Sequence, residues 1–227
     1  MKFEVLDLSH IIEEGMLKFD AAWHPDVCIE QMGTLEKVGR NTRKLALGSH
    51  TGTHMDAPLH FVCNGKSVDE IPLKTLVGKV SILDFTDLGE NEPLTKERLE
   101  KEKFGPRVIC KFGWGKMWGT KKFYKGYPFF SEEAAKYMLR KNVILVGMDT
   151  PSPDDSRIDL SGGKRGTCED SPIHKIFLQH CVVLVEYIAN LDKVHDYKGW
   201  NLSVMPLKIK GSDGSPARVC IFRGVLK

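Results

Sequence analysis

The chain has 227 residues, 41% of them hydrophobic and 28% charged, so it is long enough to bury a full core. The net charge is only +3 with both signs interspersed, which argues against a nucleic-acid or anionic-membrane partner. No apolar run approaches the ~20 residues that cross a bilayer, and an acid at position 4 argues against a signal peptide. Six scattered cysteines without a Cys-x-x-Cys pair favour reduced thiols, so we expect a cytoplasmic protein.

The N-terminal region predicts a strand over residues 3–8, in which the apolar positions shift from odd to even numbers. We expect a β-bulge to absorb that change of face. Trp23 follows, and it either stacks on an aromatic substrate or packs in the core or an interface. His10 and His24 lack ligand-like spacing and are interpreted as ordinary histidines.

The chain is organised around the segment 49–61, which follows two strands expected at 27–32 and 44–48 around a turn. The segment contains four side chains that zinc and similar divalent ions accept as ligands: His50, His54, Asp56 and His60. A helix would point two of the four away, and a straight strand would spread them over ~20 Å or more. Because Gly52 permits a positive φ and Pro58 fixes its own φ, we expect a bent loop that gathers all four.

Two other interpretations of this segment stay open. One is a polar surface loop with incidental histidines, and the other is a closed structural metal site. Structural zinc sites usually have four protein ligands and favour cysteine. The nearest cysteine, Cys63, lies outside the segment, so an open site with nitrogen and oxygen ligands fits catalysis better.

Short elements are expected after the segment. Residues 67–78 predict a turn or a single helical turn stopped by a glycine, and residues 80–85 predict a strand. A charged helix is expected from an N-cap at Thr95 to residue 103, followed by a strand at 108–112.

The next stretch, Gly113–Phe130, is rich in glycine and aromatic rings without a lasting period. We expect a loop that either walls the pocket or packs on the sheet or on a partner subunit. A helix is predicted from an N-cap at Ser131 to about Arg140, followed by a buried strand within 142–148. Asp149 at the strand end is either a site residue or a turn residue, and Asp154–Thr167 reads as a loop that could form a lid.

A second group of candidate ligands lies more than 110 residues further along the chain. Ser171 predicts an N-cap and Pro172 the first position of a helix that carries His174. Glu186 lies in the apolar run 182–188, which reads as a buried strand. Burying an unpaired carboxylate costs on the order of several kcal/mol. Glu186 therefore needs a cation, a set of hydrogen-bond donors or an exit to solvent. The cation would be a metal ion, or a lysine or arginine at a sheet edge.

The C-terminal part predicts an edge strand at 205–209, because Pro206 cannot donate to a ladder, and a closing strand at 217–223. Arg218 either meets a substrate acid or is structural. His180 falls at the end of its helix and is a poorer ligand candidate than His174.

The pattern His-x-Gly-Thr-His-x-Asp-x-Pro-x-His-Phe at 50–61 resembles the signature of the cyclase-like metal-dependent hydrolases, which include bacterial kynurenine formamidase and isatin hydrolase. Further similarity at Asp7–Ser9, Asp149–Ser152 and Asp213–Arg218 extends the resemblance over nearly the whole chain. Leu17 departs from the pattern, because the family usually has proline there.

The resemblance implies specific roles. His50, His54 and Asp56 would bind metal, and His60 would be the acid/base group. The histidine and glutamate that the family uses for a second metal match His174 and Glu186. The resemblance also implies a swivelling β/β/α, barrel-like core and a homodimer or higher homo-oligomer.

We therefore expect one α/β domain over residues 1–227, built on a mixed sheet, with one or two zinc or manganese ions. The expected reaction is hydrolysis of an amide C–N bond in a small molecule, an aryl formamide or a cyclic imide or amide. Metal-activated water would attack and His60 would move the proton. The alternatives are a lactone hydrolase or dehydratase on the same site, or a metal-binding protein without turnover.

Overall fold

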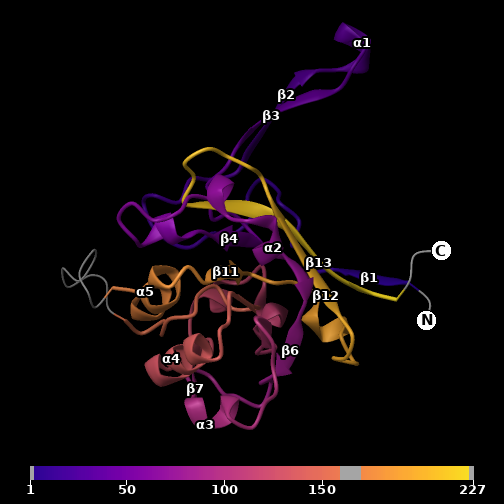
Figure 1. Cartoon of the computed structure of the whole chain (residues 1–227). Helices are drawn as coiled ribbons and strands as arrows, with labels where there is room; N and C mark the ends of the chain where they lie inside the picture. Colours follow the sequence, from indigo (N-terminus) through magenta and orange to yellow (C-terminus); the bar gives the residue numbers. More distant parts are fainter. Residues whose placement is uncertain (1–2, 159–169, 225–227) are drawn as a thin grey trace.

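A computed structural model describes residues 3–158 and 170–224 (Figure 1). Its centre is a nine-stranded mixed sheet in the order β5-β12-β13-β4-β11-β10-β8-β6, with β1 paired to β13. The strands at the two ends of this order, β5 (Val77–Lys79) and β6 (Ser81–Asp84), are separated in the chain only by Val80. The two edges of the sheet therefore come close together, and the sheet is nearly closed into a barrel. The predicted α/β fold with a mixed, barrel-like sheet is confirmed.

One half of the sheet is parallel and the other antiparallel. The parallel half consists of β6, β8 (Arg107–Lys111), β10 (Leu145–Met148) and β11 (Val183–Glu186). The antiparallel half consists of β4 (His54–Asp56), β13 (Gly214–Arg223), β12 (Asn201–Pro206), β5 and β1 (Glu4–Asp7). The two halves meet where β4 pairs antiparallel with β11.

Alternating side chains of the parallel strands build two cores. Val146 packs with the helices α4 (Glu132–Arg140) and α5 (Pro172–Gln179), which contact each other on one face of the sheet (Figure 1). Leu145, pointing the other way, joins a second core made by strands from around the sheet. Every residue of β10 is buried, which confirms the prediction of a strand covered on both faces.

A two-stranded arm projects from this body (Figure 1). It consists of β2 (Cys28–Gly33), the short helix α1 (Leu35–Val38) and β3 (Thr42–Ala46). The predicted strands are present, but a helix rather than a simple turn joins them. Every residue of β3 is exposed within the described chain, so the arm has no core of its own.

The remaining elements are short. They are the helices α2 (Leu73–Leu76) and α3 (Lys96–Leu99), the strand pair β7 (Pro93–Leu94) and β9 (Phe129–Phe130), and five 3₁₀ turns, η1 (Pro58–His60), η2 (Val68–Glu70), η3 (Trp114–Met117), η4 (Lys121–Tyr124) and η5 (Leu191–Lys193). The helix expected over 95–103 thus has a single α-helical turn. Gly78 lies within β5 and does not end an element.

Two strand predictions are wrong in detail. Strand β1 pairs with β13 in an unbroken register from Glu4 to Asp7, so no bulge is needed: the strand ends before the buried Leu8. Strand β12 begins four residues earlier than expected, and over residues 201–203 it is an interior strand, because β13 pairs with one of its edges and β5 with the other. Pro206 lies beyond the residues that pair with β5, so its missing N–H leaves no hydrogen bond between these strands unmade.

The prediction for Ser131 is confirmed, since its side chain accepts a hydrogen bond from the Ala134 N–H at the start of α4. The prediction for Ser171 is wrong. Ser171 adopts a left-handed conformation with φ 51° and makes no side-chain cap bond. The described cysteines are free, and Cys168 and most of the loop Asp154–Thr167 lie outside the described residues.

Candidate metal centre

Strand pairing brings the two distant groups of candidate ligands together. In the β4–β11 ladder His54 lies directly opposite Glu186, although 132 positions separate them in the chain. On its other edge β4 pairs with β13, with Asp56 opposite Gly214. Asp213 directly precedes Gly214, so the pairing of β4 with β13 also places Asp213 near Asp56.

The segment 49–61 bends at both ends and gathers the four side chains, as expected, but a three-residue strand, β4, lies between the two bends. His54 and Asp56 are two residues apart in β4 and share one face. Gly52, with φ 60°, turns the chain so that His50 reaches that face from the preceding turn. The 3₁₀ turn that begins at Pro58 returns His60 from the other side.

The candidate ligands converge around Asp56, which is fully buried. Asp56 Oδ1 lies 2.8 Å from His50 Nδ1 and 3.3 Å from His54 Nε2, and Asp56 Oδ2 lies 3.5 Å from His174 Nε2. Glu186 Oε2 lies 3.4 Å from His54 Nε2, and Glu186 Oε1 lies 3.2 Å from His174 Nε2. The structure thus brings all five residues of the expected ligand set into one cluster.

Outer partners fix the orientation of two of these rings. The Nδ1 of His54 lies 2.8 Å from the Gly52 carbonyl oxygen, and the Nδ1 of His174 lies 2.5 Å from Asp154 Oδ2. A ring that donates Nδ1–H to such an acceptor leaves its Nε2 lone pair free. Both Nε2 atoms face the carboxylates, which is the arrangement a metal ion needs.

Asp154 was not identified from the sequence as a site residue. Besides contacting the His174 ring, its carboxylate accepts hydrogen bonds from the backbone N–H groups of Ile173 (2.7 Å) and His174 (3.2 Å). It therefore supplies the cap of α5 that Ser171 does not. No local pattern could reveal this role, because the acceptor lies 19 residues before the helix position that it caps.

The carboxylates of the cluster have the properties of metal ligands. Asp56 Oδ1 and Oδ2 and Glu186 Oε1 are buried and accept no aligned hydrogen bond from the described residues. Burial lowers the pKa of His54, because it disfavours the charged ring. The hydrogen bonds and negative charges of Asp56 and Glu186 outweigh burial and raise the pKa of His54 to about 10. In the same way, against burial, the surrounding histidines hold the pKa of Asp56 well below its usual range. Buried acids that lack donors require a cation, and the donor set fits a divalent ion.

Two overlapping groups of atoms could each hold an ion. One consists of His54, Asp56 and Glu186, and the other of His50, Asp56 and His60. Asp56 belongs to both, so it is placed to bridge two ions. His60 is thus close enough to be a ligand, although the family resemblance implies a role in proton transfer for it.

His50 and His60 share one acceptor, Asp213, which the sequence did not single out. Asp213 Oδ2 lies 2.8 Å from His50 Nε2 and 3.2 Å from His60 Nδ1. Hydrogen bonds from these two rings hold the pKa of Asp213 well below its usual range. Asp213 is therefore an anion that fixes the orientation of both rings.

A cavity of about 360 Å³ opens over the cluster. It is lined by four histidines, Glu186 and two aromatic rings: His50, His54, His60, His174, Glu186, Phe61 and Tyr187. Trp23, which is 59% exposed, stands at the same cavity, as the sequence allowed. His24 also lines it, with its ring 6.2 Å from that of His50, although it belongs to neither group of candidate ligands in the described residues.

Other candidates lie elsewhere. The aromatic segment Gly113–Phe130 does not line this cavity: the rings of Trp118, Phe123 and Tyr124 pack against Tyr187. His180 is exposed at the end of α5 and lies outside the cluster. Arg218 pairs with Asp7 on the surface, 2.7 Å apart. Asp149 lines a different cavity.

The fold and the buried cluster of histidines and carboxylates define a metal-dependent hydrolase of α/β architecture. Residues 6–155 match the sequence profile of the family described as "Putative cyclase". The chain is 30% identical over 221 residues to the kynurenine formamidase of Bacillus cytotoxicus, covering 96% of this chain and 97% of the relative. It is 31% identical over 224 residues to the kynurenine formamidase of Bacillus cereus, with the same coverage. The chain belongs to the cyclase family.

Solved structures share the fold. An isatin hydrolase bound to the product analogue thioisatinate superposes with a TM-score of 0.82 at 23% identity, covering 99% of this chain and 93% of that one. A potential metal-dependent hydrolase with cyclase activity has a TM-score of 0.75 at 26% identity, covering 99% and 100%. No helix in the described part of the chain is long and apolar enough to cross a bilayer.

Proposed function

We propose that this protein hydrolyses an amide C–N bond in an aryl formamide or a cyclic amide, with a divalent ion held by His50, His54, Asp56, His174 and Glu186. The observation that carries the proposal is the set of three buried carboxylate oxygens, two on Asp56 and one on Glu186, that accept no aligned hydrogen bond from the described residues. Glu186 and the ligand histidines around them line an open cavity. The likeness to kynurenine formamidases over nearly the whole chain supports the amide as substrate.

The side chains have separate tasks. When bound, the ion supplies a Lewis acid for the carbonyl oxygen and lowers the pKa of water to ~7. His60 carries a proton between the attacking water and the leaving nitrogen. Asp213 holds the His60 ring through Nδ1, so that Nε2 is the atom that exchanges the proton. Asp154 holds His174 in the same manner.

The cavity walls favour an aromatic substrate. Phe19, Trp23, Phe61 and Tyr187 all line it. Flat apolar rings bind by stacking or edge contacts on such side chains, while the amide lies toward the polar floor. A cavity of about 360 Å³ is at the small end of the usual range for ligand sites, which fits a substrate with one or two rings.

The test is a substrate panel with the chelator-treated protein reloaded with zinc or with manganese. N-formyl arylamines, isatins and aryl lactones are compared by initial rates. We expect turnover of an N-formyl arylamine or an isatin that disappears after chelation and returns with metal. Turnover of lactones alone, or of none of the compounds with a fully loaded site, contradicts the proposal.

We further propose that the protein works in the cytoplasm as a homodimer in which a second copy covers the arm. The arm exposes four large apolar side chains, each more than half accessible: Met32, Leu35, Val38 and Leu45. Isolated hairpins are marginal in water, and exposed apolar patches of this kind mark protein contacts. Sedimentation analysis of the wild-type protein and of Leu45→Glu tests this: the first should be dimeric and the second should dissociate, and a monomeric wild type contradicts it.

A further inference from the structure

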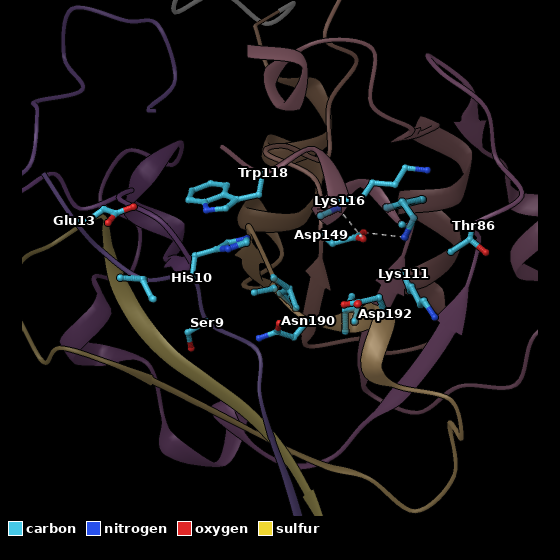
Figure 2. A pocket seen from close by; sticks show the side chains of 17 residues that line it. Ser9, His10, Glu13, Thr86, Lys111, Lys116, Trp118, Asp149, Asn190 and Asp192 are labelled. Carbon is cyan, nitrogen blue, oxygen red and sulfur yellow. Dashed lines mark hydrogen bonds between the residues drawn. The ribbon is translucent and has the colours of Figure 1, made fainter. Parts of the chain in front are cut away.

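A second cavity, of about 780 Å³, lies beside the carboxyl ends of the parallel strands (Figure 2). It shares no lining residue with the cavity over the metal centre. Its floor is buried and largely apolar, with Phe112, Ile188 and Leu191 each at most 3% exposed. Glu13, Asp192 and Lys116 stand exposed at the rim. In sheets of this type, ligands bind at the carboxyl edge of parallel strands, so the location is that of a binding site.

The floor carries one acid, Asp149, which follows β10 directly and is 2% exposed. Its carboxylate accepts hydrogen bonds from the backbone N–H groups of Phe112 (2.8 Å) and Gly115 (3.3 Å), drawn as dashed lines in Figure 2. No lysine or arginine of the described residues forms an ion pair with it: the nearby Lys111 pairs with Asp84 instead. Burial raises the pKa of Asp149 to about 6, so at neutral pH it is an anion without a counter-charge.

The lining also includes His10, whose ring is stacked on the indole of Trp118 with centroids 3.9 Å apart and planes 13° apart (Figure 2). Its Nε2 atom is buried and has no hydrogen-bond partner among the described residues. Burial lowers the pKa of His10 to about 4, so the ring is neutral. An unmet buried polar atom costs ~1–3 kcal/mol, and a ligand with an N–H group would recover that cost.

We propose that this second cavity binds a small primary amine with an aromatic or aliphatic body. The ammonium group pairs with Asp149 and donates to His10 Nε2, and the body lies on Trp118 and the apolar floor. The rim favours a cation as well, since Glu13 and Asp192 add negative charge against the exposed Lys116, while Lys111, which also lines the cavity, is paired with Asp84. An anion of the same shape would be repelled by Asp149, and an uncharged alcohol could donate one hydrogen bond to it but would supply no counter-charge.

The test compares three probes of similar shape and different charge: benzylamine, benzyl alcohol and benzoate. Each is titrated into the metal-loaded full chain by calorimetry, so the readout does not depend on turnover. We expect benzylamine to bind at least tenfold more tightly than benzyl alcohol, and benzoate not to bind here. Equal affinity of the amine and the alcohol overturns the proposal.

Variants locate the bound probe. Lys116→Glu replaces a rim cation by an anion and should tighten benzylamine binding by about 3- to 10-fold, the size of one or two exposed charge contacts. A gain of affinity cannot arise from misfolding. The matched control is Lys121→Glu, which changes an exposed lysine outside the cavity and should leave the affinity as it is.

Two further variants decide between the cavities. Asp149→Asn removes the floor charge and should weaken benzylamine binding by at least tenfold. Trp23→Ala alters only the cavity over the metal centre and should leave benzylamine binding unchanged. If Trp23→Ala abolishes binding while Lys116→Glu and Asp149→Asn do not change it, the amine occupies the metal-centre cavity and the proposal is wrong, whatever the outcome of the substrate panel.

Discussion

Asp154 connects the stability of α5 to the metal centre, and the variant Asp154→Asn separates the two. The carboxylate accepts from Ile173 N–H, His174 N–H and the His174 ring. Asparagine keeps the shape but removes the charge, and its amide places donor hydrogens against donors. Bonds to a charged acceptor contribute ~1.5–3 kcal/mol, and a lost helix cap costs ~1 kcal/mol. We expect the metal-free variant to lose about 1–3 kcal/mol in its free energy of unfolding.

The effect on the metal is measured separately. Removing the outer partner of a ligating histidine typically lowers metal affinity by ~10–100-fold, because the His174 ring is then free to rotate. Competition with a chromophoric chelator, at a temperature where circular dichroism shows the variant folded, gives this affinity. Asp87→Asn, which removes an exposed carboxylate that pairs with Arg98 and lies outside both α5 and the metal-centre cavity, is the control. An unchanged metal affinity in Asp154→Asn, alongside a large loss in His174→Ala, would refute the role given to Asp154.

Three further changes test other parts of the account. His60→Ala should lower kcat by ~10²–10⁴-fold while elemental analysis still finds bound metal; a parent-like kcat would exclude His60 as the proton carrier. Gly214→Ala should weaken metal binding by roughly tenfold, because the added Cβ would lie 2.7 Å from His50 Cε1; Gly89→Ala, which meets nothing closer than 3.4 Å, is the control. His10→Phe keeps the stack on Trp118 but removes a group whose pKa falls from 6.5 to about 4 on folding. In the wild type, His10 takes up a proton at a higher pH in the unfolded chain than in the folded one. The wild type therefore loses stability as the pH falls from 6.5 to about 4. Urea unfolding across pH 4–7 should show a shallower loss in His10→Phe, and an equal slope would contradict this.

Much of the candidate metal centre can be predicted from the residue types of two segments of the sequence. Ligand types and chain-bending residues at 50–60 predict one group of ligands, and a carboxylate in an apolar run predicts that Glu186 needs a cation. What the sequence does not give is the register. Only the ladder between β4 and β11 places His54 opposite Glu186, and that pairing is decided by packing of the whole sheet.

The partners of the ligands could not be predicted for the same reason. Asp154 and Asp213 act on rings 20 and 153–163 positions away in the chain, so no local spacing marks them. Ser171 and Pro172 show the converse error. Their pattern predicts a self-capped helix, but a distant acid takes over the cap, and tertiary context overrides the local preference.

Among the fold elements, the regular ones with strong local signals are predicted well. Ser131 caps α4, and the helix ends at Arg140 as expected. The charged stretch 95–103 is predicted less well, because its helix packs little beyond Leu99 and short helices without tertiary packing are marginal.

Whether the buried cluster holds a divalent ion is decided by the metal content of the wild-type protein and of Asp56→Asn after equilibrium dialysis against zinc. Because Asp56 belongs to both groups of ligand atoms, we expect at least one tightly held ion per chain in the wild type and none in the variant. A variant that retains the wild-type amount of zinc would contradict this expectation.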